Sequence, residues 1–171
     1  MPTLTVDRLL CVQDSPEWTP DEVYLLLAIA GRAGRCRLQA YTLSAPDWQG
    51  LQPGQRRAGA LVADPDWAPE TLVLAALLER DGREDFASGE PLEHVLASME
   101  PVRQLFITLQ AEPRVYLAAQ LLAEMDLAIA RARHNDRPLG HAQLVEPAPG
   151  SPVELDFAGH GGHYRLRFAL Q

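Results

Sequence analysis

The sequence predicts a mainly β fold of the α+β class, an antiparallel β-sandwich with two or three helices inserted at about residues 86–134. Apolar runs typical of strands recur up to Leu43, interrupted by a predicted loop at residues 14–22, and return after Gly140. Between them lie two segments with apolar residues at three- and four-residue steps, the spacing of amphipathic helices. The length of 171 residues and the hydrophobic content of 47% suit one globular unit, so we expect residues 1–171 to form a single domain.

The N-terminal part contains three predicted strands. Leu4 and Val6 share one parity in TLTVDRLLCVQ before an apolar patch, which is typical of a strand that runs from an edge into the core. A buried strand is favoured for VYLLLAIA, because it begins with β-branched and aromatic residues and is bounded by Gly31 and Gly34. Clean alternation in RCRLQAYTL predicts a surface strand of a sheet.

Residues 44–69 show little periodicity and much Pro, Gly, Asp and Trp. They predict a long connection that contains one short strand at residues 58–62. Trp48 and Trp67 are the aromatic residues expected to anchor this connection.

The wholly apolar run at residues 72–78 fits a buried strand or a helix equally well. Local signals favour a helix, because Pro69 and Glu70 suit a first turn and Gly82 suits a C-terminal cap. The pattern alone leaves both possibilities open.

Two amphipathic helical segments follow, PLEHVLASMEPVRQLFITLQ and PRVYLAAQLLAEMDLAIARARHN. Pro101 and Pro113 fit first-turn positions, so we expect a break near Glu100 and a turn near Glu112. The apolar stripes are expected to pack on the domain core. Strands return in GHAQLVEP, in VELDFAG and, most clearly, in GHYRLRFAL, where apolar residues alternate with arginines.

The charge of the chain limits its partners. The formal net charge is −8, and all 15 basic residues are arginine. Nucleic acid and anionic membranes are therefore not expected partners, since both need local positive potential. RARHNDR, residues 131–137, is the one basic run, and it fits the C-terminal end of a helix. No signal sequence is recognised and no apolar run approaches the roughly 20 residues of a membrane span, so a cytoplasmic protein is expected.

Cysteine and histidine do not form a zinc pattern. Cys11 and Cys36 are too few and too far apart, and we expect two buried free thiols. His160 and His163 flank two glycines in a predicted turn and are expected to be solvated.

Acidic segments resemble the calcium loops of C2 domains. VQDSPEWTPDEVYLLL resembles the first loop region, in which one aspartate follows a strand and a second precedes a tyrosine-bearing strand; Asp14, Asp21 and Tyr24 occupy these places. LVLAALLERDG, followed much later by NDRPLGHAQL, resembles the third loop, with Glu79, Asp81 and Asp136 at ligand positions. The resemblance implies that residues 72–78 form a strand, and we adopt that interpretation.

The layout also resembles a group of uncharacterised bacterial C2-like proteins, through Asp-Glu-x-Tyr at residues 21–24, Glu-x-Asp at residues 79–81 and a closing Gly-x-Tyr-x-Leu-x-Phe at residues 162–168. No activity follows from it. It implies a C2-like sandwich that could bind Ca²⁺, an ion that takes six to eight oxygen ligands. The implied ligands are Asp14, Asp21, Glu79, Asp81 and Asp136, with Asp85 or Glu22 in reserve. The alternative is a solvated acidic rim neutralised by Arg80 and Arg137.

The favoured function is therefore a non-enzymatic binding or assembly module that acts with a protein partner or as a homo-oligomer. One alternative is a divalent-metal-dependent hydrolase that uses the same carboxylates, with a base or nucleophile near Asp81 and His134. Another is a nucleic-acid-associated stress-response protein that uses Arg131, Arg133 and Arg137. No serine, histidine or glycine-rich motif provides a catalytic signature.

Overall fold

The computed structural model describes residues 2–13, 23–31, 34–43, 53–54, 56–79, 90–132 and 136–171. Within these residues the elements are, in chain order, β1 (Leu4–Gln13), β2 (Val23–Ala30), β3 (Cys36–Thr42), β4 (Arg56–Asp64), β5 (Leu72–Glu79), α1 (Glu90–Ser98), α2 (Glu100–Leu109), α3 (Arg114–Arg131), β6 (Arg137–Pro138), β7 (Gln143–Val145), β8 (Val153–Gly159) and β9 (Gly162–Leu170).

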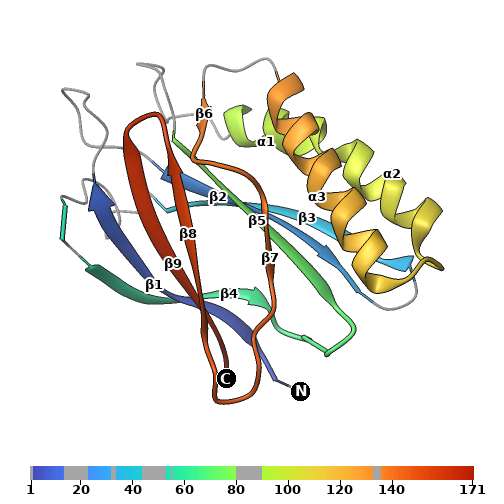
Figure 1. Ribbon diagram of the computed structural model, residues 1–171, viewed down its shortest axis with the longest axis horizontal. Coiled ribbons are helices and arrows are strands. Elements are labelled where there is room, and N and C mark those ends of the chain that lie inside the picture. Colours follow the sequence, from blue (N-terminus) through green and yellow to red (C-terminus); the bar gives the residue numbers. More distant parts are fainter. Residues whose placement is uncertain are drawn as a thin grey trace.

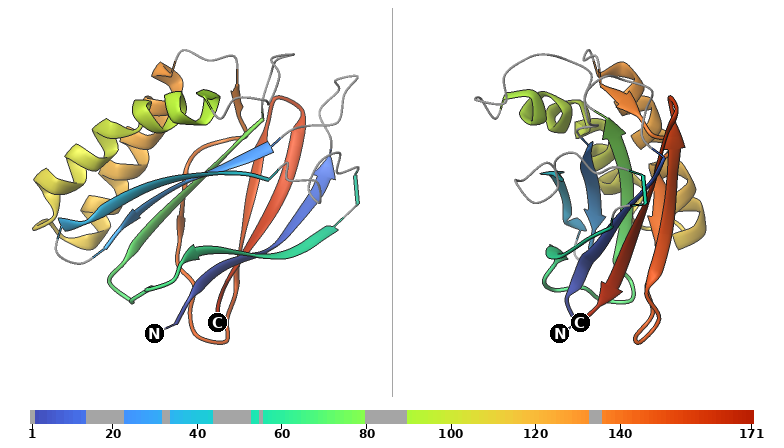
Figure 2. Two further views of the ribbon diagram at one scale, coloured as in Figure 1. Left: turned by 180° about the vertical axis from the view of Figure 1, so that it is seen from behind. Right: turned by 90° about the vertical axis from the view of Figure 1, so that its left-hand side faces the viewer.

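The strands form two antiparallel sheets that pack face to face (Figure 1). Sheet A has the order β4-β1-β9-β8, and sheet B has the order β3-β2-β5-β6, with β7 also paired to β5. Helices α1, α2 and α3 cover the outer face of sheet B, whereas none of the described helices lies on the outer face of sheet A (Figures 1 and 2). Both termini lie at one end, where Thr3 N donates to Gln171 O at 2.8 Å. The predicted class, a β-sandwich with a helical insertion, is confirmed.

Two hydrophobic cores lie in the described part of the molecule, one on each side of sheet B. The first lies between the sheets and contains the largest fully buried aromatic side chains, which are Phe157, Tyr164 and Phe168. The second lies between sheet B and the helices and includes Val102, Phe106 and Met125. The helical stripes therefore pack on the core, as the periodicity predicts.

Residues 72–78 are a strand, as the C2 resemblance implies and against the local signals for a helix. β5 lies in the middle of sheet B and pairs antiparallel with β2 from Val23↔Glu79 to Ala30↔Leu72. All eight residues of β5 are buried. Because both faces of this strand are covered, it needs apolar residues at every position and loses the alternation that would identify it.

Two predictions about sheet A are corrected. β1, predicted to run from an edge into the core, lies between β4 and β9 and is paired on both sides. β4 covers Arg56–Asp64 rather than residues 58–62, because it pairs with β1 from Leu10↔Arg56 to Leu4↔Asp64. Trp67, only 7% exposed, packs into the core between the sheets as expected, whereas Trp48 lies outside the described residues.

The helical breaks fall close to their predicted places. α1 ends before Met99 and α2 has a proline in its first turn, as Pro101 predicts. Pro113, predicted in the first turn of the next helix, is instead its N-cap. The strand expected in GHAQLVEP is reduced to β7, three residues long, and just before it Ala142 N donates to the Asp126 carboxylate of α3 at 2.7 Å.

Candidate functional site

Strand ends from both sheets meet at the end of the sandwich opposite the termini, here called the loop end and marked by Val23, Glu79, Arg137 and Gly159. Register places Val23, Glu79 and Arg137 side by side on β2, β5 and β6. A Cβ on Gly159 of β8 would lie 2.9 Å from the carbonyl oxygen of Pro138, so glycine permits the two sheets to approach closely here. Figures 1 and 2 show this end away from the N and C labels.

Asp136 lies at the loop end immediately before β6. The hydroxyl group of Tyr24, the second residue of β2, donates a hydrogen bond to Asp136 Oδ2 at 2.7 Å. Residues 24 and 136 are far apart in the sequence, so the sandwich itself brings together the segments that precede β2 and β6. Tyr24 belongs to the core on the helix side of sheet B.

Glu79 ends β5 and is only 2% exposed. It has the parity of Val73, Ala75 and Leu77, whose side chains belong to the core between the sheets. Asp136 therefore approaches the strand ends from the helix side, and Glu79 from the inter-sheet side. One cation could contact both carboxylates only beyond the ends of β5 and β6. Arg137, predicted as a possible neutralising partner, is directly opposite Glu79 in the register.

The other predicted ligands, Asp14, Asp21 and Asp81, lie outside the described residues, as do the reserves Asp85 and Glu22. Among the residues that the structure describes, no group of three or more His, Cys, Asp or Glu side chains could hold a metal ion. The five-carboxylate site thus remains a prediction, of which Glu79 and Asp136 are the two members placed at one end of the fold.

Several other acidic residues in the described part of the chain form ion pairs away from the loop-end acids. On the outer face of sheet A, Asp156 receives a hydrogen bond from His163 at 2.8 Å and another from Arg165 Nε at 3.1 Å. The bond from His163, followed by that from Arg165, lowers the pKa of Asp156 below its usual value. Asp126 of α3 binds the ring of His141 at 2.9 Å.

Neither cysteine forms a disulfide, as predicted, but the prediction that both are buried is correct only for Cys11. Cys11 is fully buried, whereas Cys36 is only partly buried at the start of β3. Burial raises the pKa of Cys36 to about 11, because the effect of burial is larger than the opposing effect of the nearby Arg103 charge. The Cys36 thiol is therefore protonated and a weak nucleophile at neutral pH.

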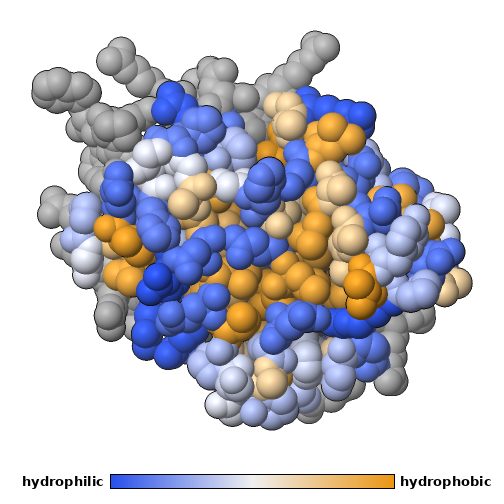
Figure 3. Space-filling view, in the orientation of Figure 1, coloured by the Kyte–Doolittle hydropathy of each residue, from blue (hydrophilic) through white to orange (hydrophobic). Residues whose placement is uncertain are grey.

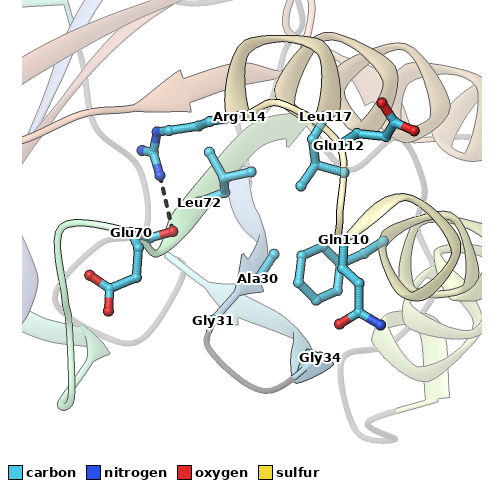
Figure 4. A pocket seen from close by; sticks show the side chains of 10 residues that line it. Ala30, Gly31, Gly34, Glu70, Leu72, Gln110, Glu112, Arg114 and Leu117 are labelled. Carbon is cyan, nitrogen blue, oxygen red and sulfur yellow. Dashed lines mark hydrogen bonds between the residues drawn. The ribbon is translucent and has the colours of Figure 1, made fainter.

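A small hollow of about 280 Å³ opens between the start of β5, the β2–β3 turn and the α2–α3 turn (Figure 4). Leu72, Phe106 and Leu117 form its apolar floor, and Arg114 and Gln110 lie at its rim. The Arg114 guanidinium donates to Glu70 O at 3.0 Å, as the dashed line in Figure 4 marks, and lies 3.7 Å from Glu146. Arg114 thus links the first turn of α3 to the segment that precedes β5.

Sequence analysis did not identify this hollow. Its rim comes from three separate turns, and only the glycines at positions 31 and 34 were noted, as strand boundaries. Gly34 has a positive φ of 70°, and a Cβ there would lie 2.9 Å from Gln110 Oε1. A glycine that follows an apolar strand by a few residues was the available signal for a close approach.

Comparisons with known proteins find only distant likenesses in structure. No protein-family model matches the chain, and no curated protein matches its sequence. A solved C2 domain of plant extended synaptotagmin 1 aligns at 4% identity and a TM-score of 0.38, covering 99% of this chain and 92% of that one. It has the C2 fold that the sequence resembles.

Human GIVD cytosolic phospholipase A2, solved with methyl gamma-linolenyl fluorophosphonate, aligns at 8% identity and a TM-score of 0.34, over 99% of this chain and 16% of that one. At such scores neither likeness supports an argument about function, and the fold class rests on the strand pairing itself. Among the described residues, no helix is both long and apolar enough to cross a membrane.

Proposed function

We propose that the chain is a non-enzymatic binding module that takes a divalent cation, calcium by preference, at the loop end and presents that end to a protein partner. The cation would be held by the carboxylates of Asp14, Asp21, Glu79, Asp81 and Asp136. The hydrogen bond from Tyr24 to Asp136 is the observation that supports this most. It joins the start of β2, three residues after Asp21, to the acid that precedes β6.

Calcium suits this arrangement better than other common cations. It accepts six to eight oxygen ligands in flexible geometry, whereas magnesium demands a near-ideal octahedron and zinc prefers nitrogen and sulfur. Carboxylates gathered at one rim repel one another, and a bound cation would balance their charge. Glu79 and Asp136 approach from opposite sides of sheet B, so an ion just beyond the strand ends would be reached from both sides.

The test is a thermal melt of the wild type and two matched variants in calcium, magnesium and chelator. Asp136→Asn removes one charge but keeps an oxygen that can accept the Tyr24 hydrogen bond. Asp66→Asn makes the same change at an exposed position in the turn after β4, close to the termini. Calcium at a hundredfold its Kd should stabilise the wild type by about 2.7 kcal/mol, or roughly 5–10 °C in Tm.

We expect Asp66→Asn to retain this shift and Asp136→Asn to lose most of it, with nearly unchanged melts in chelator. The proposal is wrong if calcium leaves the wild-type Tm unchanged, or if Asp136→Asn shifts as much as Asp66→Asn does.

A further inference from the structure

The outer face of α3 is apolar along its whole length. Five exposed residues, which we call the α3 ridge, follow one another at three- and four-residue steps: Tyr116, Ala119, Ala123, Leu127 and Ala130. They lie opposite the buried face formed by Leu121 and Met125. A helix at the surface of a soluble domain normally turns charged and polar residues outwards, so this ridge is unusual.

The apolar surface extends beyond the ridge. Val115, beside Tyr116, is 83% exposed, and Tyr116 and Leu127 are 49% and 41% exposed. Figure 3 shows a band of orange and tan along α3 that widens towards β7, where Leu122 and Leu144 are only partly buried. Contiguous apolar patches of this kind mark interaction surfaces.

We propose that the α3 ridge binds the α3 ridge of a second copy of this chain, antiparallel, with the two-fold axis at Ala123. The helix positions then pair large residues with small ones. Tyr116 faces Ala130 of the second copy, Leu127 faces its Ala119, and the two Ala123 residues meet at the axis. Each contact away from the axis occurs twice, as a two-fold interface requires.

Charge supports a second copy over an unrelated partner. Arg131 ends α3 with a side chain that is 66% exposed, and its pair with Glu124 is long, at 3.9 Å. In the antiparallel arrangement Arg131 faces Val115 of the second copy, and Glu112 precedes Val115 by three residues, in the turn before α3. Glu112 is exposed in the turn before α3, so two reciprocal Arg131–Glu112 pairs close the two ends of the interface.

The size of the surface predicts a weak dimer. An 18-residue helix is about 27 Å long, and one helical face buries less than the roughly 800 Å² per partner of a standard interface. We therefore expect a dissociation constant in the range of about 10–100 µM.

The experiment is sedimentation velocity from about 5 to about 300 µM, a range that brackets this Kd. All samples contain chelator, so that the result does not depend on cation binding at the loop end. The wild-type mass should rise with concentration from 18.8 kDa towards twice that value. Ala123→Glu places two carboxylates at the axis and should weaken the dimer at least about tenfold, while glutamate preserves the helix, as circular dichroism would verify.

Ala97→Glu is the matched control, because it adds the same charge at an exposed position of α1. It should dimerise as the wild type does. Glu112→Arg should weaken the dimer, and the added substitution Arg131→Glu should restore it. A wild type that remains at 18.8 kDa throughout, or an Ala123→Glu variant that dimerises unchanged, would overturn the proposal.

Discussion

The two sheets differ in how many of their faces are covered. Sheet B is buried on both sides, and every residue of β2 and β5 is buried. Within the described residues sheet A is covered on one side, and in β9 buried residues alternate with partly exposed ones from Gly162 to Phe168. The comparison teaches that the sequence pattern of a strand depends on how many of its faces are covered. A strand covered on both faces is continuously apolar, whereas a strand covered on one face alternates apolar and polar residues.

The outer face of sheet A is instead held by ion pairs. Arg167 of β9 binds Asp7 of β1 through two bonds, of 2.7 and 2.5 Å, and this pairing raises the pKa of Arg167. Arg165 and His163 bind Asp156 of β8. Charges of both signs alternate across this face, so the face can remain exposed to water without a covering layer.

The largest effects are expected where the comparison is sharpest, in β5. Leu74 faces the helices and Leu77 faces the other sheet, and both are fully buried. Leu74→Ala and Leu77→Ala should each lower the free energy of unfolding by about 2–5 kcal/mol, as measured by urea denaturation. In β9 the adjacent residues Arg165 and Leu166 should differ in how much stability their substitution removes. Leu166→Ala removes a buried side chain, whereas Arg165→Ala removes a partly exposed one.

Leu166→Ala should therefore lower the free energy of unfolding about as much as the β5 variants do, and Arg165→Ala should lower it by less than about 1 kcal/mol. A loss under about 1 kcal/mol for Leu74→Ala would mean that the helices do not cover sheet B as described.

A smaller effect distinguishes the ion pairs of sheet A. The side chains of Arg167 and Asp7 are only 28% and 19% exposed, and their contact has two bonds. Arg8 and Glu154 are more exposed and 3.8 Å apart. A double-mutant cycle to alanine should give a coupling of about 1 kcal/mol for Arg167–Asp7 and close to zero for Arg8–Glu154. Equal couplings would remove the distinction.

The smallest predicted effect depends on pH. The pKa of Asp156 is lowered in the folded chain, so its pairs stabilise the fold above the ordinary aspartate pKa of about 3.9 and are lost as the pH falls through the lower folded value. Asp156→Asn should cost roughly 0.5 kcal/mol at about pH 5, since the pair is exposed, and the difference from the wild type should vanish in more acidic solution. A difference that grows below about pH 4 would contradict this.

Much of the fold could be predicted because local pattern and tertiary environment agree. β9 was evident from its alternation, and the α1–α2 break from Pro101. Residues 72–78 could not be assigned from pattern, because a strand covered on both faces has the composition of a buried helix. β4 was predicted too short because Arg56 and Arg57 are not typical of strands, and their pairing with β1 is a long-range contact.

The site was less predictable, for a geometric reason. The sequence could place Glu79 and Asp136 at strand ends, and the fold brings both to the loop end. The sequence could not show that the Glu79 side chain is on the inter-sheet face of β5, whereas Asp136 meets Tyr24 on the helix side of sheet B. Helices α1, α2 and α3 lie between the two acids in the chain. The alternation of side chains along β5 therefore does not predict which side of the sheet the residues at β6 face.

Calorimetric titration with calcium is the most direct measurement of the central proposal. The account predicts saturable heat from the wild type, with about one cation per chain, and loss of that heat in Asp136→Asn but not in Asp66→Asn. Heat no greater than that of dilution in the wild type, or unchanged binding in Asp136→Asn, would contradict the assignment of the loop end as a cation-binding site.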